Sequence, residues 1–258
     1  MGKRSFRHNN FGQVLVVTAL LVALLLLSTA LYVIETEKNT PVVQAEENQF
    51  SAYKQSIINT LISALANATN GGDSSVLSMD LAELKSVVTS HSHKTMLTMD
   101  YEVRTTSPYQ NGIWISWGTN GQGVSSAYST FLFNSSNPLA TSSSAYAVNI
   151  TSEINFSGTY MQLTGNSKQV NLTVKVLNEA KPALAQNFTF FYDYDGSLST
   201  VDWIEVASPA INNFGNGTYA VSFVCDTAQE NDDVFVSTYC HDQRGILVSA
   251  NVTCVRIG

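Results

Sequence analysis

"FGQVLVVTALLVALLLLSTALYVIE", residues 11–35, is an almost unbroken apolar stretch near the start of the chain. Between Val14 and Ile34 no residue carries a charge, and the only polar side chains are the hydroxyls of Thr18, Ser28 and Thr29. At ~1.5 Å per residue, a helix over this segment is about 31 Å long, which matches the ~30 Å hydrocarbon core of a bilayer. The sequence therefore predicts an N-terminal transmembrane helix over residues 13–35.

The charges around this segment predict its orientation. Lys3, Arg4 and Arg7 precede the apolar run, and Glu35 and Glu37 follow it. By the positive-inside rule the basic leader, residues 1–12, lies in the cytoplasm. We therefore expect a single-pass protein of the cell membrane, with its N-terminus cytoplasmic and all residues after Thr36 extracellular.

A cleavable secretory signal is the first alternative. Ser28-Thr29-Ala30 offers small residues at the positions that a signal peptidase inspects. The apolar run continues through Ile34, however, and is longer than the ~7–15 residues of a usual signal-peptide core. Retention as a membrane anchor is the preferred interpretation.

A second alternative comes from a resemblance. The basic leader, the pair Gly12-Gln13 and the following apolar helix resemble the class III signal of archaeal type IV pilins and related surface proteins. The resemblance implies processing between Gly12 and Gln13 and packing of the helix into a filament. The sequence departs from that pattern at Phe11, where Lys or Arg is usual, and at Val17, where many pilins have Glu.

The composition narrows the possible partners. Charged residues make up only 13% of the chain, and without the three basic residues of the leader 10 basic residues face 20 acidic ones, a net charge of −10. Such a body repels nucleic acid and anionic lipid head groups. We therefore expect no nucleic-acid partner; the expected partners are the lipid bilayer and other cell-envelope proteins or copies of the same chain.

A helical hairpin is predicted over residues 45–92. Asn39-Thr40-Pro41 predicts a break after the first helix, because proline lacks a backbone N–H and disfavours helix in the preceding residue. Apolar residues then recur at helical spacing on either side of the stop signal Asn70-Gly71-Gly72, with Asp73 as the cap of the second helix. The two apolar stripes are Phe50, Tyr53, Ile57, Leu61 and Leu65, and Leu77, Leu81, Leu84 and Val88.

From Lys94 onward the period changes to two, which is typical of strands. Residues 94–165 form a β-rich region that we expect to be interrupted by the Ser/Asn/Pro-rich stretch 134–144. Residues 166–258 contain six short alternating runs, and this number indicates an immunoglobulin-like β-sandwich. "GNGTYAVSF", residues 215–223, resembles the strand-opening motif of filamin-type and other immunoglobulin-like domains. The expected fold class is thus mainly β, with a transmembrane helix, a helical hairpin and a C-terminal sandwich.

Acceptor sequons for N-glycosylation occur eight times, at Asn67, Asn134, Asn149, Asn155, Asn171, Asn187, Asn216 and Asn251. Several of these Asn residues alternate with apolar residues, as Asn171 does with Val170 and Leu172. Successive side chains of a strand point to opposite faces, so the strand sequons are predicted on the solvent face. The same parity predicts that Cys225, Cys240 and Cys254 are buried.

No motif for catalysis is apparent. His91 and His93 lack a nearby set of carboxylates for a metal, and Asp193-Tyr194-Asp195-Gly196 departs from a calcium loop in the place of its glycine. Three cysteines without Cys-x-x-Cys spacing do not indicate a metal site. Trp114 and Trp117 alternate with Ile113 and Ile115, which favours core packing. We expect a non-enzymatic surface protein without cofactor, acting in cell-envelope display, adhesion or association; an extracellular hydrolase is the least supported alternative.

Overall fold

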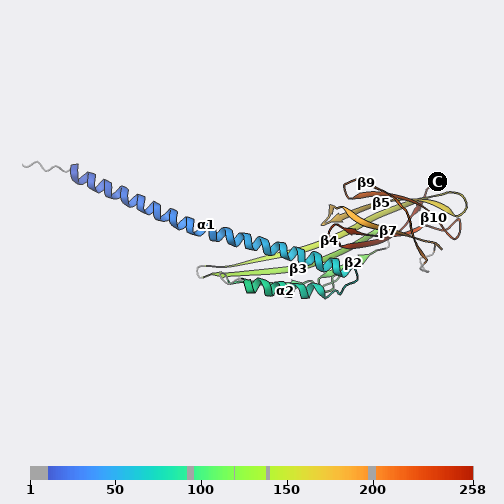
Figure 1. Ribbon diagram of the computed structural model, residues 1–258, viewed down its shortest axis with the longest axis horizontal. Helices are drawn as coiled ribbons and strands as arrows, with labels where there is room; N and C mark the ends of the chain where they lie inside the picture. The colour runs from blue at the N-terminus through green and yellow to red at the C-terminus, as the bar shows by residue number, and fades with distance from the viewer. Residues whose placement is uncertain (1–10, 92–95, 119, 138–139, 197–201, 258) are drawn as a thin grey trace, which may run out of the picture. The chain divides into compact units, whose positions relative to one another are not determined.

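The computed structural model describes residues 11–91, 96–118, 120–137, 140–196 and 202–257, except for the side chains of residues 11–21, 35–49, 91, 96, 137 and 140. The chain forms two compact units, residues 1–54 and 55–258. The described part is mainly β, with two sheets (Figure 1). The basic leader falls almost entirely on residues 1–10, outside the described residues.

One helix, α1 (Phe11–Thr69), covers both the predicted membrane segment and the first arm of the predicted hairpin. The break predicted at Asn39-Thr40-Pro41 is therefore wrong. The prediction assumed that Pro41 ends the helix. A proline inside a helix removes one backbone hydrogen bond and costs about 3 kcal/mol, and a long helix can tolerate this cost. In the described part of the chain, no helix has a stretch that is both long and apolar enough to cross a membrane.

The end of α1 and the start of the next helix follow the sequence signals. α1 ends at Thr69, and the chain turns through Gly71, whose φ is +92°. Asp73 Oδ1 then accepts a hydrogen bond from the backbone N–H of Ser75 at 2.8 Å, just before α2 (Val76–His91). This bond lowers the pKa of Asp73. The predicted cap is confirmed.

The apolar stripes of the two helices supply one part of the core. Ile57, Leu61 and Leu65 of α1 are buried, and so are Leu77, Leu81 and Val88 of α2. The second helix lies against β1, where Tyr101 donates a hydrogen bond from its hydroxyl to the carbonyl of Ser78 at 3.1 Å.

The larger sheet has the order β1-β3-β4-β5-β10-β9 in the described residues, with β2, β6 and β13 paired to β3, β5 and β4. Its strands are β1 (Met96–Val103), β2 (Ile113–Trp117), β3 (Gln122–Asn137), β4 (Ala140–Gln162), β5 (Ser167–Asn178), β6 (Lys181–Pro182), β9 (Ala210–Asn213), β10 (Thr218–Asp226) and β13 (Val255–Arg256). All pairs are antiparallel except that of β13 with β4.

The strands β3 and β4 are longer than predicted. They pair from Gln122↔Asn155 to Asn137↔Ala140, through most of the stretch 134–144 that was expected to interrupt the strands. That expectation is wrong, because backbone hydrogen bonds of a hairpin do not require apolar side chains. On the other side, β4 pairs with β5 from Ser152↔Asn178 to Gln162↔Lys168, so one sheet continues across the expected domain boundary at 165/166.

The smaller sheet has the order β12-β11-β7-β8 and consists of β7 (Ala185–Asp193), β8 (Trp203–Glu205), β11 (Phe235–Asp242) and β12 (Leu247–Thr253). Inward residues of both sheets form one core cluster, which contains Phe190, Val236 and Val248 of this sheet and Val174, Tyr219 and Val221 of the larger one. Two sheets that share a core in this way form a β-sandwich.

The two sheets lie close together where β3 passes β12. A Cβ atom added at Gly123 would lie 1.8 Å from the carbonyl oxygen of Ser249. We expect Gly123→Ala to lower the free energy of unfolding by about 1–3 kcal/mol or more, because backbone must move to admit the methyl group. Thermal and urea unfolding of both proteins measure this.

Gly165→Ala is the matched control. Gly165 has a φ of +63°, and a methyl group there meets nothing within 4 Å, so this variant changes only the backbone strain, by about 1–2 kcal/mol. An effect of Gly123→Ala no larger than that of Gly165→Ala would contradict the close approach of the two strands.

Candidate functional site

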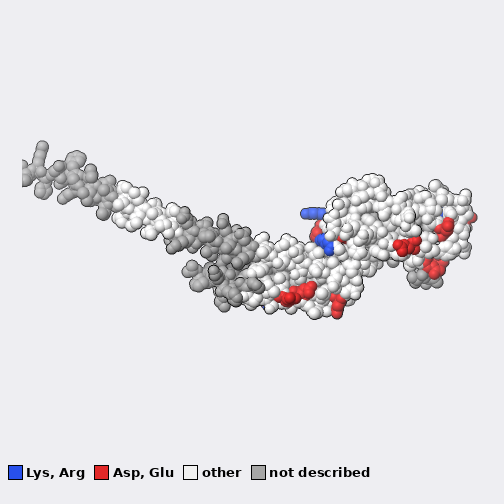
Figure 2. Space-filling model, in the orientation of Figure 1, with Lys and Arg blue, Asp and Glu red and all other residues white. Residues whose placement is uncertain are grey.

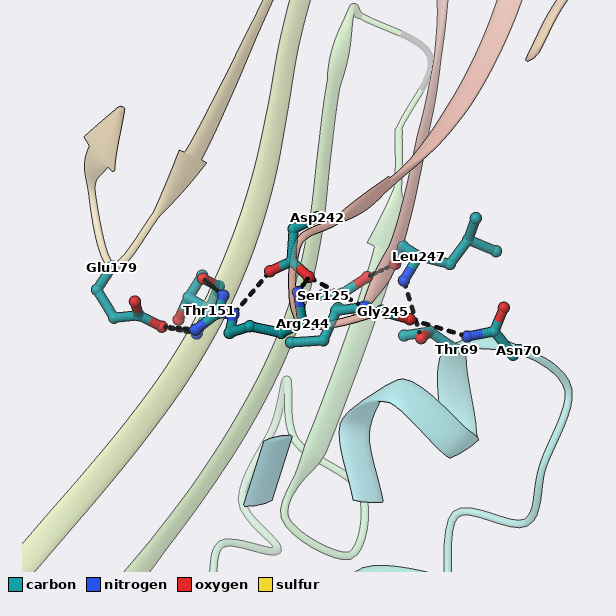
Figure 3. A network of polar contacts seen from close by, with 10 residues as sticks. Thr69, Asn70, Ser125, Thr151, Glu179, Asp242, Arg244, Gly245 and Leu247 are labelled. Atoms are coloured by element: carbon teal, nitrogen blue, oxygen red, sulfur yellow. Dashed lines mark hydrogen bonds and ion pairs between the residues drawn. The ribbon is translucent and has the colours of Figure 1, made fainter. Parts of the chain in front are cut away.

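A network of polar contacts joins α1, β3, β4, the β5–β6 turn and the β11–β12 turn (Figure 3). We call it the α1–sheet junction. Its members are Thr69, Asn70, Ser125, Thr151, Glu179, Asp242, Arg244, Gly245 and Leu247.

Asp242 is the buried centre of the junction. Its carboxylate is fully buried at the end of β11. Oδ1 accepts hydrogen bonds from the backbone N–H groups of Arg244 at 2.8 Å and Ile246 at 3.0 Å, and Oδ2 accepts one from Arg244 Nε at 2.7 Å. A buried carboxylate needs such donors, because removal from water otherwise disfavours its charge.

Arg244 connects this turn to the larger sheet. Its Nη1 donates to Glu179 Oε1 at 2.7 Å, and its Nη2 donates to the carbonyl oxygen of Thr151 at 3.0 Å. Burial by itself would lower the pKa of Arg244, but the hydrogen bonds and charges of Glu179 and Asp242 outweigh burial and raise it. The guanidinium group is thus held between two carboxylates.

The other side of the turn holds the end of α1. Leu247 donates its backbone N–H to Thr69 Oγ1 at 3.1 Å, and Asn70 Nδ2 donates to the carbonyl oxygen of Gly245 at 3.1 Å. Ser125 Oγ donates to the carbonyl oxygen of Leu247 at 2.7 Å. The polar atoms of the turn are therefore occupied by contacts that join elements, which indicates a structural role.

His241 at the end of β11 does not belong to a catalytic triad. Its Nε2 lies 2.9 Å from Asn70 Oδ1, and its Nδ1 is buried without a hydrogen bond to any described residue. A catalytic triad needs a nucleophilic hydroxyl on one nitrogen and a carboxylate on the other. The described residues around His241 provide neither.

The segments weighed in the sequence as possible metal sites, and not predicted to be such sites, can be placed only in part. His93 lies outside the described residues, and so does the segment 197–201 that follows Asp193-Tyr194-Asp195-Gly196. In the portion of the chain that the structure describes, no group of three or more His, Cys, Asp or Glu side chains could hold a metal ion.

The two tryptophans of β2 differ from each other. Trp114 is half-buried, and its ring contacts Tyr109 edge-on at 5.9 Å between centroids. Trp117 is exposed and donates from Nε1 to Ser125 Oγ at 3.2 Å. The predicted core packing is wrong for Trp117. Strand alternation places Trp114 on one face of β2 and Trp117 on the other, together with Ile113 and Ile115. It does not show that this end of the sheet lacks a cover.

A groove of 590 Å³ lies on the outer face of the larger sheet. It is lined by residues of β4, β5, β9 and β10, with Val255 of β13, and most of these are small or carry a hydroxyl or amide group. The lining contains no titratable side chain, so it offers no group for acid–base catalysis. Figure 2 shows that the visible face is largely uncharged, with separate acidic groups and few basic ones.

All three cysteines are buried, as the strand parity predicted, and all three are free. Burial raises the pKa of Cys225 to about 11 and those of Cys240 and Cys254 to about 12. Because the thiolate is the reactive form, these side chains are inert in the folded protein at neutral pH.

We expect stability to fall as the pH rises above about 9. The three thiols keep their protons in the folded state up to about pH 11, whereas in the unfolded chain they lose them near pH 9. Burial also raises the pKa of Tyr160 and Tyr192, and these shifts likewise lower stability as the pH rises. Burial lowers the pKa of Lys168, and this shift has the opposite effect on stability. Urea unfolding midpoints at pH 8, 9 and 10 measure the effect.

Replacement of the cysteines provides the control. We expect a triple variant, Cys225→Ala, Cys240→Ala and Cys254→Ala, to show a smaller fall of the urea unfolding midpoint between pH 8 and pH 10 than the wild type. A wild-type midpoint that rises over this range, or a decline that the triple variant retains in full, would contradict the assignment.

The sequons all lie in the described part of the chain, and none of the eight Asn residues is buried. Asn67, Asn149, Asn171, Asn187 and Asn216 are exposed, and Asn134, Asn155 and Asn251 are half-buried. The exposure predicted for the strand sequons is confirmed for Asn149, Asn171 and Asn187, whereas Asn155 and Asn251 are half-buried. Whether any of them is modified stays a prediction. The processing pair Gly12 and Gln13 lies in the helical backbone of α1, and its side chains are outside the described residues.

Comparison with known proteins adds no assignment. No protein-family model matches the chain, and no curated protein matches it either. A functional proposal therefore depends on the chain's own residues.

Proposed function

We propose that the protein is a single-pass, membrane-anchored surface protein that acts in cell-envelope display, adhesion or association rather than in catalysis. In this proposal the apolar part of α1 lies in the bilayer, the leader is cytoplasmic and the β-rich body is extracellular. The C-terminal sandwich would be of the immunoglobulin-like type, for which the turn before β10 and the buried Tyr219 offer support.

The observation that carries the proposal is the exposed aliphatic surface of α1. Every residue from Val22 to Ile34 is exposed, and the large apolar ones include Leu25 and Leu26 at 66% and Tyr32 at 73%. A helix that is apolar on all sides is stable only where something other than water surrounds it, such as lipid or other helices.

A filament subunit is the second candidate. The unbroken helix from Phe11 to Thr69 favours it, since a subunit that packs through its N-terminal helix needs that helix to continue into the folded body. In this case other copies of the apolar segment, in place of lipid, would cover Val22–Ile34. The resemblance of Gly12-Gln13 to a processing site points in the same direction.

Intact-mass analysis and N-terminal sequencing of the protein from its native source separate the two candidates. Retention of the basic leader supports the anchor and excludes the filament. A mature N-terminus at Gln13, lost in a Gly12→Leu variant but kept in an Asn10→Leu control, supports the filament. A start at Leu31 contradicts both, because most of the apolar segment would then be removed.

A further inference from the structure

The eight sequons differ in the backbone that carries them. Seven lie within a helix or strand: α1 carries Asn67, and the strands β3, β4, β5, β7 and β12 carry Asn134, Asn149, Asn155, Asn171, Asn187 and Asn251. Asn216 is the exception, because it lies between β9, which ends at Asn213, and β10, which begins at Thr218. The sequon Asn216-Gly217-Thr218 is thus the one that a surface turn presents.

The tip of this turn is open to solvent. Phe214 is 58% exposed, Asn216 is exposed, and a Cβ atom added at Gly215 would meet nothing within 4 Å. Gly215 and Gly217 have φ values of +75° and +76°, which allow the backbone to reverse within a few residues. An enzyme can therefore approach the Asn216 side chain without displacing a neighbouring element.

The base of the turn is fixed. Val176 of β5 donates its backbone N–H to the carbonyl oxygen of Gly217 at 2.9 Å, and a Cβ atom at Gly217 would lie 2.8 Å from the carbonyl oxygen of Val176. The turn therefore holds its side chains in a defined position.

The side-chain amide of Asn216 is oriented so that its nitrogen is available for attachment of a sugar. Its Oδ1 accepts a hydrogen bond from the backbone N–H of Thr218 at 3.1 Å. No described residue makes a hydrogen bond to Nδ2, the atom to which an N-linked sugar is attached. The same turn brings Asn216 and Thr218, the two side chains that define the sequon, onto one short segment.

The strand sequons at Asn171 and Asn187 lack this access. Asn171 lies in β5 between β4 and β10, opposite Thr159 on one side and Ser222 on the other, so both edges of its backbone are paired. Asn187 has a φ of +55° in a bulge of β7, but its sequon threonine, Thr189, is paired with Tyr239 of β11. A transferase that binds the acceptor backbone would have to open the sheet to reach such sites.

We propose that Asn216 is the preferred N-glycosylation site of the folded protein, and that the strand sequons at Asn171 and Asn187 are not acceptors once the chain has folded. The biological relevance rests on the proposed extracellular location, since only there does the body meet the transferase. The ligand class is an oligosaccharide carried on a lipid phosphate.

The transfer is a balanced substitution. Asn216 Nδ2 attacks the anomeric carbon of the sugar, the new C–N bond forms, and the bond between that carbon and the phosphate oxygen breaks. The lipid phosphate leaves with the bonding electron pair, and the amide nitrogen gives up one proton. No oxidant or reductant is needed.

The test uses the full-length protein, folded in detergent, with a purified oligosaccharyltransferase and its lipid-linked oligosaccharide. The enzyme's activity is first verified on an unrelated sequon peptide. Intact mass counts the transferred glycans, and glycopeptide mapping locates them. We expect a glycan at Asn216 and none at Asn171 or Asn187, and we expect transfer to these strand sites when the protein is unfolded in urea and diluted into the reaction.

Matched variants make the test specific. Asn216→Asp keeps the Oδ1 acceptor for Thr218 N–H but removes the amide nitrogen, so it should fold normally and accept no glycan. Thr218→Ser keeps the sequon and should retain transfer, whereas Thr218→Val should lose it. Asn171→Asp and Asn187→Asp should leave transfer to the folded protein unchanged.

Three results would overturn the proposal: no transfer to the folded protein by the verified enzyme, transfer to Asn171 or Asn187 at a rate equal to that at Asn216, or undiminished transfer to the Asn216→Asp variant. None of them depends on the location of the protein in its cell. A failure here is therefore distinguishable from a failure of the proposed function, which the mature N-terminus tests.

Discussion

Replacement of Arg244 by methionine should destabilise the folded protein by about 3–5 kcal/mol. The guanidinium group neutralises Asp242, which is fully buried, and also binds Glu179 and the backbone of Thr151. Methionine retains much of the side-chain length but leaves the Asp242 carboxylate buried without a cation. Urea unfolding of the full-length protein in detergent, followed by tryptophan fluorescence, measures the difference.

An exposed ion pair supplies the control. Lys85 Nζ lies 2.6 Å from Asp100 Oδ1, and both side chains are about half exposed to water. Exposed pairs contribute about 0–1 kcal/mol, so Lys85→Met should have little effect. If Arg244→Met costs no more than Lys85→Met, Asp242 is not the buried centre described here.

The second large effect concerns the apolar segment of α1. A double variant, Leu25→Arg and Leu26→Arg, should move most of the protein from the membrane fraction into the alkaline-carbonate extract. Each arginine near the centre of a membrane helix costs about 2.5–3.5 kcal/mol on insertion scales. Both leucines are 66% exposed in the isolated chain, so the substitution does not disturb a packed core.

Leu184→Arg serves as the control for this experiment. Leu184 is also exposed, at 38%, but it belongs to the β-rich unit. The control should remain in the membrane fraction. If the double variant also remained there, attachment to the membrane would have to come from another part of the protein.

Strand parity was the most informative property of the sequence. It correctly predicted that Cys225, Cys240 and Cys254 are buried and that Asn171 and Asn187 are exposed. Parity succeeds because the side-chain period of a strand is fixed by the backbone and does not depend on which strands pair. Most of the predicted strands were confirmed for the same reason.

Local rules failed where a long element was involved. Pro41 and the polar stretch 134–144 were interpreted as stops, yet α1 and the β3–β4 hairpin continue through them. In both cases the backbone hydrogen bonds before and after the unfavourable residues keep the helix or the hairpin continuous. A single-residue rule does not include this cooperativity.

The α1–sheet junction could not have been predicted from the sequence. The β5–β6 turn and the β11–β12 turn lie next to each other in the fold, and this brings Glu179 together with Asp242 and Arg244. In the sequence, Glu179 and Arg244 are 65 residues apart. By contrast, the special position of Asn216 had a local signal, because glycines flank it on both sides.

The proposed topology is tested most directly by adding protease to intact cells that produce the protein. We expect digestion of the β-rich body, residues 55–258, without disruption of the membrane, while a cytoplasmic marker protein stays intact. Urea-treated cell lysate shows that the body can be cleaved. If the body survives on intact cells and is digested only after the membrane is broken, it does not lie outside the cell, and the proposed function is wrong.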